Sequence, residues 1–473
     1  MNAPVVRLFG LVIVLFALLV AFTSRWSVFE ASALRDNPNN RRELLQEAMI
    51  KRGLIRAGDG AALARSLPAQ GKTFTRTYPT GRLFAHAVGY SYTSLGRAGL
   101  ERYYNDALTG RSTELVSALD SVLGSDREGD DLRTSLNPKA QEVAYQGLAG
   151  RKGAAVALDI KTGAVSVMAS NPSFDPNRLD EAGRLRRLNS DNANSPLFNR
   201  ATQIGYPPGS TFKVVTAAAA LDAGRYTPGS VVNGDSPKTI SGVELNNFDN
   251  ESFGSIDLTT ALTKSVNTVW AQVGVDLGPR TMTRYMEGFG FYSKPEIDYP
   301  PDQVDASGAY RRGRLVRPTS SSVDVGRLAI GQSTLLVTPL QMASVAQTIA
   351  NGGVRMKPHM GERIVDREGR TVDEIGPERA DRVVSAKTAR ELTIMMKNVV
   401  REGTGTAAAL EGVEVAGKTG TAEIDIQRGI NDPWFIGFSG RHAVAVVVER
   451  VQGGQGGTVA APIAKQILEA LGE

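Results

Sequence analysis

Tyr206-Pro207-Pro208-Gly209-Ser210-Thr211-Phe212-Lys213 is the stretch that decides how this 473-residue chain is interpreted. The Pro-Gly pair interrupts regular structure directly before Ser210, and the Ala- and Val-rich run that follows predicts a helix. Ser210 is therefore expected at a helix N-terminus, where unpaired N–H groups and the helix dipole favour developing negative charge. Lys213 follows on the same helix face, so a neutral Lys213 is placed to take the proton of the Ser210 hydroxyl.

Alone, this motif is weak evidence for a reactive serine. Ser-x-x-Lys is more often a helix cap followed by a surface lysine. An ordinary lysine, with a pKa of about 10.4, is also a poor base at neutral pH until burial or a second cation lowers that pKa. If Ser210 is a nucleophile, another part of the chain must therefore bring a positive charge close to Lys213.

A second motif, Lys264-Ser265-Val266-Asn267, stands at the start of an apolar helical stretch. Ser265 is a candidate for relaying a proton between lysines or to a leaving amine. Asn267 is a candidate for a hydrogen bond to a substrate amide. Ser-x-Asn alone is almost no evidence for a catalytic site, and it becomes informative only together with the other motifs.

The third motif, Lys418-Thr419-Gly420-Thr421, lies on or beside a predicted strand. Lys418 is the candidate for the second positive charge. We expect Gly420 to let a ligand backbone approach closely and the hydroxyls of Thr419 and Thr421 to hold a carboxylate.

Composition narrows the chemistry further. The chain has no cysteine, which excludes disulfides, thiol catalysis, Cys-zinc sites and iron–sulfur clusters. Its three histidines, His86, His359 and His442, are far apart and none is in a ligand-like pair, so a structural or surface role is expected for each. Acyl-transfer chemistry must then use a base other than histidine, and we predict neither a metal site nor a cofactor.

The charge balance is mildly basic. The chain has 54 Lys and Arg against 49 Asp and Glu, a net charge of +5, with no dense basic tract. This pattern indicates an evenly solvated surface rather than a polyanion site, and no nucleic-acid partner is expected.

The N-terminus carries a targeting segment. An unbroken apolar run from Leu8 to Phe22 follows Arg7, and residues 5–24 together reach the length that a membrane-spanning helix needs. Because Ala21-Phe22-Thr23 is a poor cleavage site, an uncleaved signal-anchor is favoured over a cleaved signal peptide. Arg7 predicts a single-pass plasma-membrane protein with its N-terminus inside and its catalytic domain outside the cytoplasm.

Strand and helix patterns indicate an α+β fold after about residue 131. Two hairpins are predicted at opposite ends of this part of the chain, so we expect one central antiparallel sheet, flanked by helices, on which the two ends meet. The hairpins join 154–158 to 164–168 and 434–438 to 443–448, and helices are predicted over 385–401, with Ser385 as the N-cap and Gly403 at the end, and over 461–471. The expected domains are a cytoplasmic stub and transmembrane anchor (1–24), an N-terminal pedestal, similar to a dimerisation domain (25–130), and a catalytic domain (131–473).

Ser265 follows Ser210 by 55 residues, and Lys418 follows Ser265 by 153 residues. In this order and spacing, the three motifs resemble those of the serine penicillin-recognising superfamily. The length, the short pedestal and the Tyr206-to-Lys213 context resemble most of all the penicillin-binding protein A type of actinobacteria, and other segments resemble class B penicillin-binding proteins in general. These segments include Gly99-Leu100-Glu101 and Gly403-Thr404-Gly405. The resemblance implies a transpeptidase domain of the β-lactamase-like fold on a smaller pedestal.

The resemblance also implies roles for the motif residues. Ser210 would attack the carbonyl of the penultimate D-Ala of a stem pentapeptide, with Lys213 as base and Lys418 lowering its pKa. Ser265 would shuttle the proton, and Asn267 would orient the substrate. The implied carboxylate and oxyanion contacts come from Thr419 and Thr421 hydroxyls and from the Ser210 and Thr421 backbone N–H groups.

The implied function is a peptidoglycan D,D-transpeptidase that cross-links stem peptides during cell wall synthesis, in division or shape, and is acylated by β-lactams. Implied partners are stem peptides of lipid II-derived strands, β-lactam antibiotics, the plasma membrane, a separate glycosyltransferase and other cell-wall or division proteins. Three alternatives stay open: a D,D-carboxypeptidase, a β-lactamase, and an inactive penicillin-binding scaffold or sensor. Val266 in the Ser-x-Asn motif departs from the aspartate of class A β-lactamases and disfavours that branch.

Overall fold

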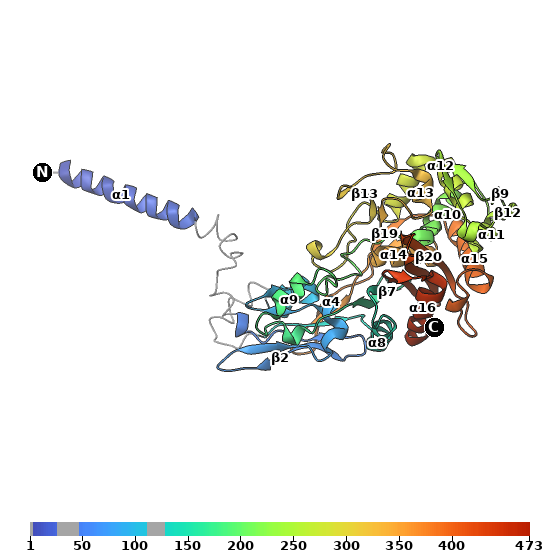
Figure 1. Cartoon of the computed structure of the whole chain (residues 1–473). Helices are drawn as coiled ribbons and strands as arrows, with labels where there is room; N and C mark the ends of the chain where they lie inside the picture. Colours follow the sequence, from blue (N-terminus) through green and yellow to red (C-terminus); the bar gives the residue numbers. More distant parts are fainter. Residues whose placement is uncertain (1–2, 26–46, 111–127) are drawn as a thin grey trace.

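The computed structural model describes residues 3–25, 47–110 and 128–473 (Figure 1). Helix α1 (Ala3–Ser24) lies apart from the folded body and is exposed from Val6 to Thr23. Its segment Val6–Ser24, 19 residues, is long and apolar enough to cross a membrane, as the sequence predicts.

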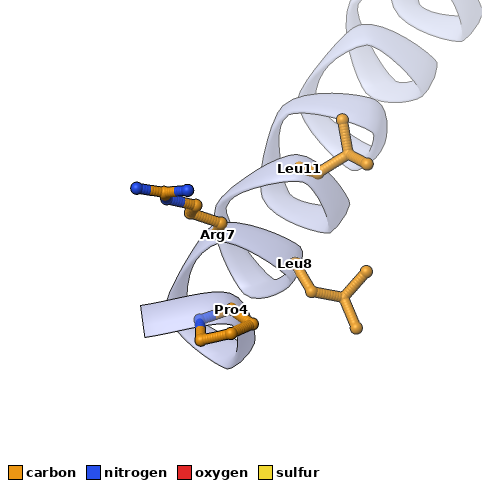
Figure 2. Close-up of a pocket in the computed structure, with 4 residues that line it drawn as sticks. All are labelled: Pro4, Arg7, Leu8 and Leu11. Atoms are coloured by element: carbon orange, nitrogen blue, oxygen red, sulfur yellow. The ribbon is translucent and has the colours of Figure 1, made fainter. Parts of the chain in front are cut away.

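The first turns of α1 form a shallow hollow between Pro4, Arg7, Leu8 and Leu11. Figure 2 shows Arg7 pointing to the side opposite Leu8 and Leu11. Because the hollow lies on the outside of one exposed helix, it offers no enclosed binding site, and the apolar side chains are suited to contact lipid.

A six-stranded antiparallel sheet forms the centre of the C-terminal part of the chain. In spatial order its strands are β20 (Ala416–Asp425), β21 (Ile430–Ser439), β22 (His442–Val448), β7 (Gly153–Asp159) and β8 (Val165–Asn171), with β23 (Val451–Gln452) paired to β21. The pairs β7–β8 and β21–β22 are the two predicted hairpins. Strand β22 pairs with β7 over its whole length, so the two ends of this region meet on one sheet, as predicted.

Successive residues of a strand point to opposite faces of the sheet. Both faces of this sheet carry buried apolar side chains, and helices cover each of them. On one face, Ala155 of β7 and Val446 of β22 pack with α8 (Pro138–Gly147) and α16 (Ala461–Leu471). On the other, Val156 and Ala445 pack with three further helices. These are α10 (Lys213–Asp222), α12 (Asn267–Gly288) and α14 (Pro339–Ala350).

Helix α15 (Ala386–Glu402) packs against β20. Its predicted N-cap is confirmed, since the Ser385 side chain accepts a hydrogen bond from the Thr388 N–H, and its C-cap is Gly403. The shorter elements of the C-terminal part are η3 (Pro176–Arg178), α9 (Arg184–Ser190), η4 (Gly209–Phe212), β9 (Val231–Asn233), β10 (Lys238–Ile240), β11 (Val243–Leu245), η5 (Phe248–Asn250), β12 (Ser255–Asp257), α11 (Leu258–Thr263), η6 (Pro301–Gln303), β13 (Gly308–Arg311), β14 (Arg314–Leu315), α13 (Val325–Ala329), β15 (Leu335–Leu336), β16 (Val354–Met356), β19 (Arg379–Arg382), η7 (Thr406–Ala408) and η8 (Gly456–Ala460).

A second sheet forms the pedestal. Its strand order is β18 (Thr371–Glu374), β17 (Gly361–Val365), β6 (Asp131–Thr134), β1 (Ile55–Arg56), β2 (Ala62–Pro68) and β3 (Phe74–Thr77). Strands β17 and β18 come from late in the chain, so the C-terminal part contributes to this sheet. The remaining pedestal elements are η2 (Gly81–Phe84), α4 (Ala85–Val88), β4 (Ser91–Tyr92), β5 (Gly96–Arg97), α5 (Gly99–Tyr103) and α6 (Asn105–Leu108).

A buried ionic cluster holds the pedestal together. The Glu101 carboxylate is fully buried and accepts hydrogen bonds from Arg52, at 2.9 and 3.2 Å, and from Arg76, at 2.5 Å. Burial alone would raise the pKa of Glu101, but the two guanidinium groups hold it below its ordinary value. The described architecture confirms the predicted α+β class, with one antiparallel central sheet flanked by helices and a smaller N-terminal unit.

Candidate active site

Ser210 lies in the short 3-10 turn η4, which leads directly into α10. The turn needs Gly209, whose φ of +52° lies in the left-handed region and whose added Cβ would meet the Thr421 backbone at 3.0 Å. Ser210 is half-buried and faces a cleft, whereas Lys213 is completely buried at the start of α10. The predicted placement of Ser210 at a helix start with Lys213 one turn later is therefore observed.

Ser265 lies in the tight connection between α11 and α12. Its φ of +59° is unusual for a residue with a side chain, and such strain is concentrated at functional positions. The Lys213 Nζ donates to the Ser265 carbonyl at 2.7 Å and lies 3.3 Å from the Ser265 hydroxyl. It also donates to Asn267 Oδ1 at 2.7 Å, and the Asn267 amide nitrogen donates to the Asn246 carbonyl.

Lys418 reaches the same hydroxyl from β20. Its Nζ donates to Ser265 Oγ at 2.9 Å and to the Thr419 carbonyl at 3.0 Å. The structure thus brings together side chains from α10, the α11–α12 connection and β20, which are separated by up to 205 residues in sequence (418 − 213). Both lysines have one shared neighbour, the Ser265 hydroxyl.

Burial lowers the pKa of both lysines, so each loses its proton more readily than an ordinary lysine. Burial, followed by the charge on Lys418, lowers the pKa of Lys213 well below its ordinary value. Burial lowers the pKa of Lys418 to about 7. If Lys213 is neutral, two of its hydrogen atoms serve the Ser265 carbonyl and Asn267, and its lone pair remains for a hydroxyl proton.

The direct contact expected between Ser210 and Lys213 is not among the hydrogen bonds of residues 3–25, 47–110 and 128–473, so it stays a prediction. Lys213 is instead bonded to Ser265 and Asn267. Catalytic hydrogen bonds are often long without substrate and shorten in the productive complex.

The cleft over these groups has a volume of about 810 Å³. Strand β20 is the edge strand of the central sheet, so its outer edge is available for an extended peptide. Residues of all three motifs line the cleft, among them Ser210, Ser265, Asn267, Thr419, Gly420 and Thr421.

The structure gives Gly420 a neighbour that the sequence did not predict. A Cβ added there would lie 2.7 Å from the Pro208 carbonyl oxygen and 3.1 Å from the Thr211 nitrogen. The absence of a side chain at Gly420 therefore lets the Ser210 turn pack on β20. Gly420 also lines the cleft, so the expected approach of a ligand stays a prediction.

The three histidines lie away from this centre. His86 is buried, and this burial is the main reason that its pKa falls to about 4. Its Nε2 lies 2.9 Å from the Pro196 carbonyl. His442 contacts Glu473, and His359 lies near the Lys357 carbonyl. None of the three lines the cleft, and the described residues contain no group of three or more His, Cys, Asp or Glu that could hold a metal ion.

Comparison with known proteins places this geometry in a family. The sequence model of the penicillin-binding protein transpeptidase domain matches residues 153–469. The chain belongs to the penicillin-binding protein transpeptidase family. The model of the penicillin-binding protein A dimerisation domain matches residues 52–132, within the pedestal.

Full-length relatives support this assignment. The chain is 34% identical to the peptidoglycan D,D-transpeptidase PbpA of Mycolicibacterium smegmatis over 99% of both chains. It is also 34% identical to PbpA of Mycobacterium tuberculosis, again over 99% of both. The family resemblance drawn from the three motifs is thereby confirmed.

Solved structures agree in fold. The ceftriaxone acyl-enzyme of penicillin-binding protein A from M. tuberculosis has a TM-score of 0.82 and 33% identity, covering 90% of this chain and 99% of that one. The penicillin G acyl-enzyme of the same protein has a TM-score of 0.80 and 32% identity, covering 89% and 100%. This penicillin-binding protein is therefore a serine acyltransferase by family, as predicted.

Sequence reasoning missed the residues that hold the Ser210 turn from behind. The Trp434 Nε1 donates to the Pro207 carbonyl at 2.9 Å, and its ring lies edge-on to Tyr206. The Tyr206 hydroxyl donates to Glu449 at 2.6 Å. Trp434 was predicted as a strand residue, but which segment its indole would meet depends on the sheet as a whole.

Proposed function

We propose that this chain cross-links peptidoglycan as a D,D-transpeptidase in which Ser210 is the nucleophile and a neutral Lys213 is the base. The observation that carries the proposal is the meeting of two fully buried lysines at one hydroxyl. Their Nζ atoms lie 2.9 and 3.3 Å from Ser265 Oγ, and Ser265 lines the cleft that Ser210 faces. Two adjacent cations in a dry site cannot both stay protonated easily, so a base becomes available near neutral pH without imidazole.

The proposed acylation proceeds in one attack and one departure. Lys213 takes the Ser210 proton as Oγ attacks the carbonyl carbon of the penultimate D-Ala. The backbone N–H groups of Ser210 and Thr421 stabilise the oxyanion, each contributing about 3 kcal/mol if it behaves like other such donors. The C–N bond then breaks, and the terminal D-Ala amine leaves with a proton delivered through Ser265.

Deacylation reverses these roles with a different amine. The amine of a neighbouring stem peptide attacks the Ser210 ester, loses a proton to the base, and forms the cross-link as the Ser210 hydroxyl is regenerated. During acylation, before the terminal D-Ala leaves, the Thr419 and Thr421 hydroxyls hold its carboxylate. Asn267 orients the donor peptide while it accepts a hydrogen bond from Lys213. A β-lactam would acylate Ser210 in place of the stem peptide.

We further propose a plasma-membrane location, with α1 as the anchor, the N-terminus inside and the transpeptidase domain outside. Arg7 at the start of the apolar helix supports this orientation. We keep the domain limits 1–24, 25–130 and 131–473 as proposals. The two matched family models concern dimerisation and transpeptidation, so we propose that a separate glycosyltransferase polymerises the glycan and that other cell-wall or division proteins bind the pedestal.

Mass spectrometry after penicillin treatment tests the nucleophile. We expect the mass of one intact penicillin on the peptide that contains Ser210, stable for minutes or longer, and none in Ser210→Ala. An adduct on another residue would refute the assignment of Ser210. An adduct lost within seconds would instead favour a β-lactamase.

A further inference from the structure

Thr404 places a second hydroxyl beside Thr419 in the cleft. Its Oγ1 is 2.5 Å from the Thr419 Oγ1, and both residues line the cleft. Thr404 lies outside the three motifs that identify the site, and the function proposed above uses Thr419 without it.

The backbone around Thr404 is fixed by three neighbours. The N–H groups of Gly403 and Gly405 both donate to the Val399 carbonyl at the end of α15, at 3.1 and 3.0 Å. A Cβ on Gly403 would lie 2.5 Å from the Thr263 carbonyl, just before the Ser265 connection. A Cβ on Gly457 would lie 2.4 Å from the Thr404 carbonyl. Thr404 is therefore held between α15, α11 and η8 rather than placed on a free loop.

The neighbouring threonine shows what such a contact achieves. Thr421 Oγ1 accepts a hydrogen bond from the Gly456 N–H at 3.3 Å. A hydroxyl that accepts a hydrogen bond from a fixed donor keeps its own hydrogen free for another acceptor, here a group bound in the cleft. Thr419 reaches the same state only if Thr404 donates to it, because a hydroxyl pair has one donor in the shared bond.

We propose that Thr404 is a positioning residue that donates its hydroxyl hydrogen to Thr419, so that Thr419 directs its own hydrogen to the carboxylate of the donor peptide or β-lactam. This inference rests on the proposed function. Both threonine hydroxyls then direct a hydrogen toward one anion. The Gly456 N–H orients the Thr421 hydroxyl, and the Thr404 hydroxyl orients that of Thr419.

Acylation kinetics of the full-length protein in detergent test the proposal. The probes are a fluorescent penicillin, which carries the carboxylate, and its methyl ester, which does not. Thr404→Val keeps the shape but removes the hydroxyl, and Thr404→Ser keeps the hydroxyl. Thr406→Val is the matched control, because Thr406 is exposed in the same segment and does not line the cleft.

We expect Thr404→Val to lower the second-order acylation rate constant for the penicillin by about 10-fold, the size expected for weakening one hydrogen bond to a charged group. The rate with the ester should stay within about twofold, Thr404→Ser should recover most of the penicillin rate, and Thr406→Val should match the wild type. An unchanged penicillin rate in Thr404→Val, or an equal loss with penicillin and ester, would overturn the proposal. Failure of the underlying function is distinct, since the wild type would then show no adduct at Ser210.

Discussion

Replacing Lys418 by Met removes a buried cation while keeping a side chain of similar shape, and the structure sets the size of the effect on Lys213. The Nζ atoms of Lys418 and Lys213 lie 2.9 and 3.3 Å from Ser265 Oγ, so their separation cannot exceed the sum of these distances, 6.2 Å. At an effective dielectric constant of about 20, two unit charges about 6 Å apart repel by about 3 kcal/mol. That repulsion corresponds to about 2 pH units in the pKa of Lys213.

The direction of the pH shift depends on which protonation state of Lys213 reacts. Lys213 accepts a proton only when it is neutral, which occurs above its pKa, and in the wild type that pKa lies well below 10.5. The acylation rate of the wild type should therefore rise with pH well before an ordinary lysine would lose its proton. Lys418→Met should move this rise to higher pH by up to about 2 pH units. Near neutral pH the rate would then fall by up to about 100-fold and recover in part as the pH increases.

Stopped-flow acylation with a fluorescent penicillin, repeated over a pH series, measures this shift. Lys264→Met is the matched control, because Lys264 is an exposed lysine that lines the same cleft. We expect its pH profile to keep the wild-type midpoint. The reasoning is refuted if Lys418→Met lowers the rate by one constant factor at every pH, since Lys418 would then act without changing the pKa of Lys213.

Three further predictions concern single side chains. Ser265→Ala should slow acylation by about 10²- to 10⁴-fold, the usual contribution of a positioned proton-transfer group, with the melting temperature as the check that the fold is intact; a rate within threefold of wild type would exclude the shuttle. Gly420→Ala should destabilise the protein by about 1–3 kcal/mol in urea unfolding and slow penicillin labelling, because the new methyl group would lie 2.7 Å from the Pro208 carbonyl oxygen; unchanged labelling would show that the Ser210 turn tolerates displacement. Glu101→Gln should lower the free energy of unfolding by about 3–5 kcal/mol at neutral pH, since it leaves two buried guanidinium groups uncompensated. Because the pKa of Glu101 is lowered in the folded state, the difference between Glu101→Gln and wild type should shrink as the pH falls through that pKa, and a difference that grows in acid would contradict the account.

Local patterns predicted most of the central sheet and its helices. The hairpin strands, the Ser385 cap and the helix Ala461–Leu471 depend on alternation, turn residues and helical spacing within a short window, and all agree with the structure. The pedestal sheet could not be predicted in the same way. Strands β17 and β18 join it from more than 200 residues beyond β1, and nothing in their own sequence indicates which strand they will meet.

The candidate site divides along the same line. Lys213 needs a second cation to act as a base, which made Lys418 a candidate, and the family resemblance implied that Lys418 lowers the pKa of Lys213. The support behind the site was not predictable. The indole of Trp434 on Pro207, the Pro208 carbonyl against Gly420 and the Thr404 hydroxyl on Thr419 are contacts between segments distant in sequence, and no short-range pattern marks them.

The central claim is that the Ser210 hydroxyl, the two lysines and the Ser265 hydroxyl act as one group. A crystal structure of the penicillin acyl-enzyme tests it most directly. We predict penicillin bonded to Ser210 Oγ, with Lys213 Nζ within hydrogen-bonding distance of that oxygen, about 2.6–3.2 Å, and Lys418 still bonded to Ser265. An acylated Ser210 that lies far from both lysines, or an adduct on any other side chain, would contradict the account.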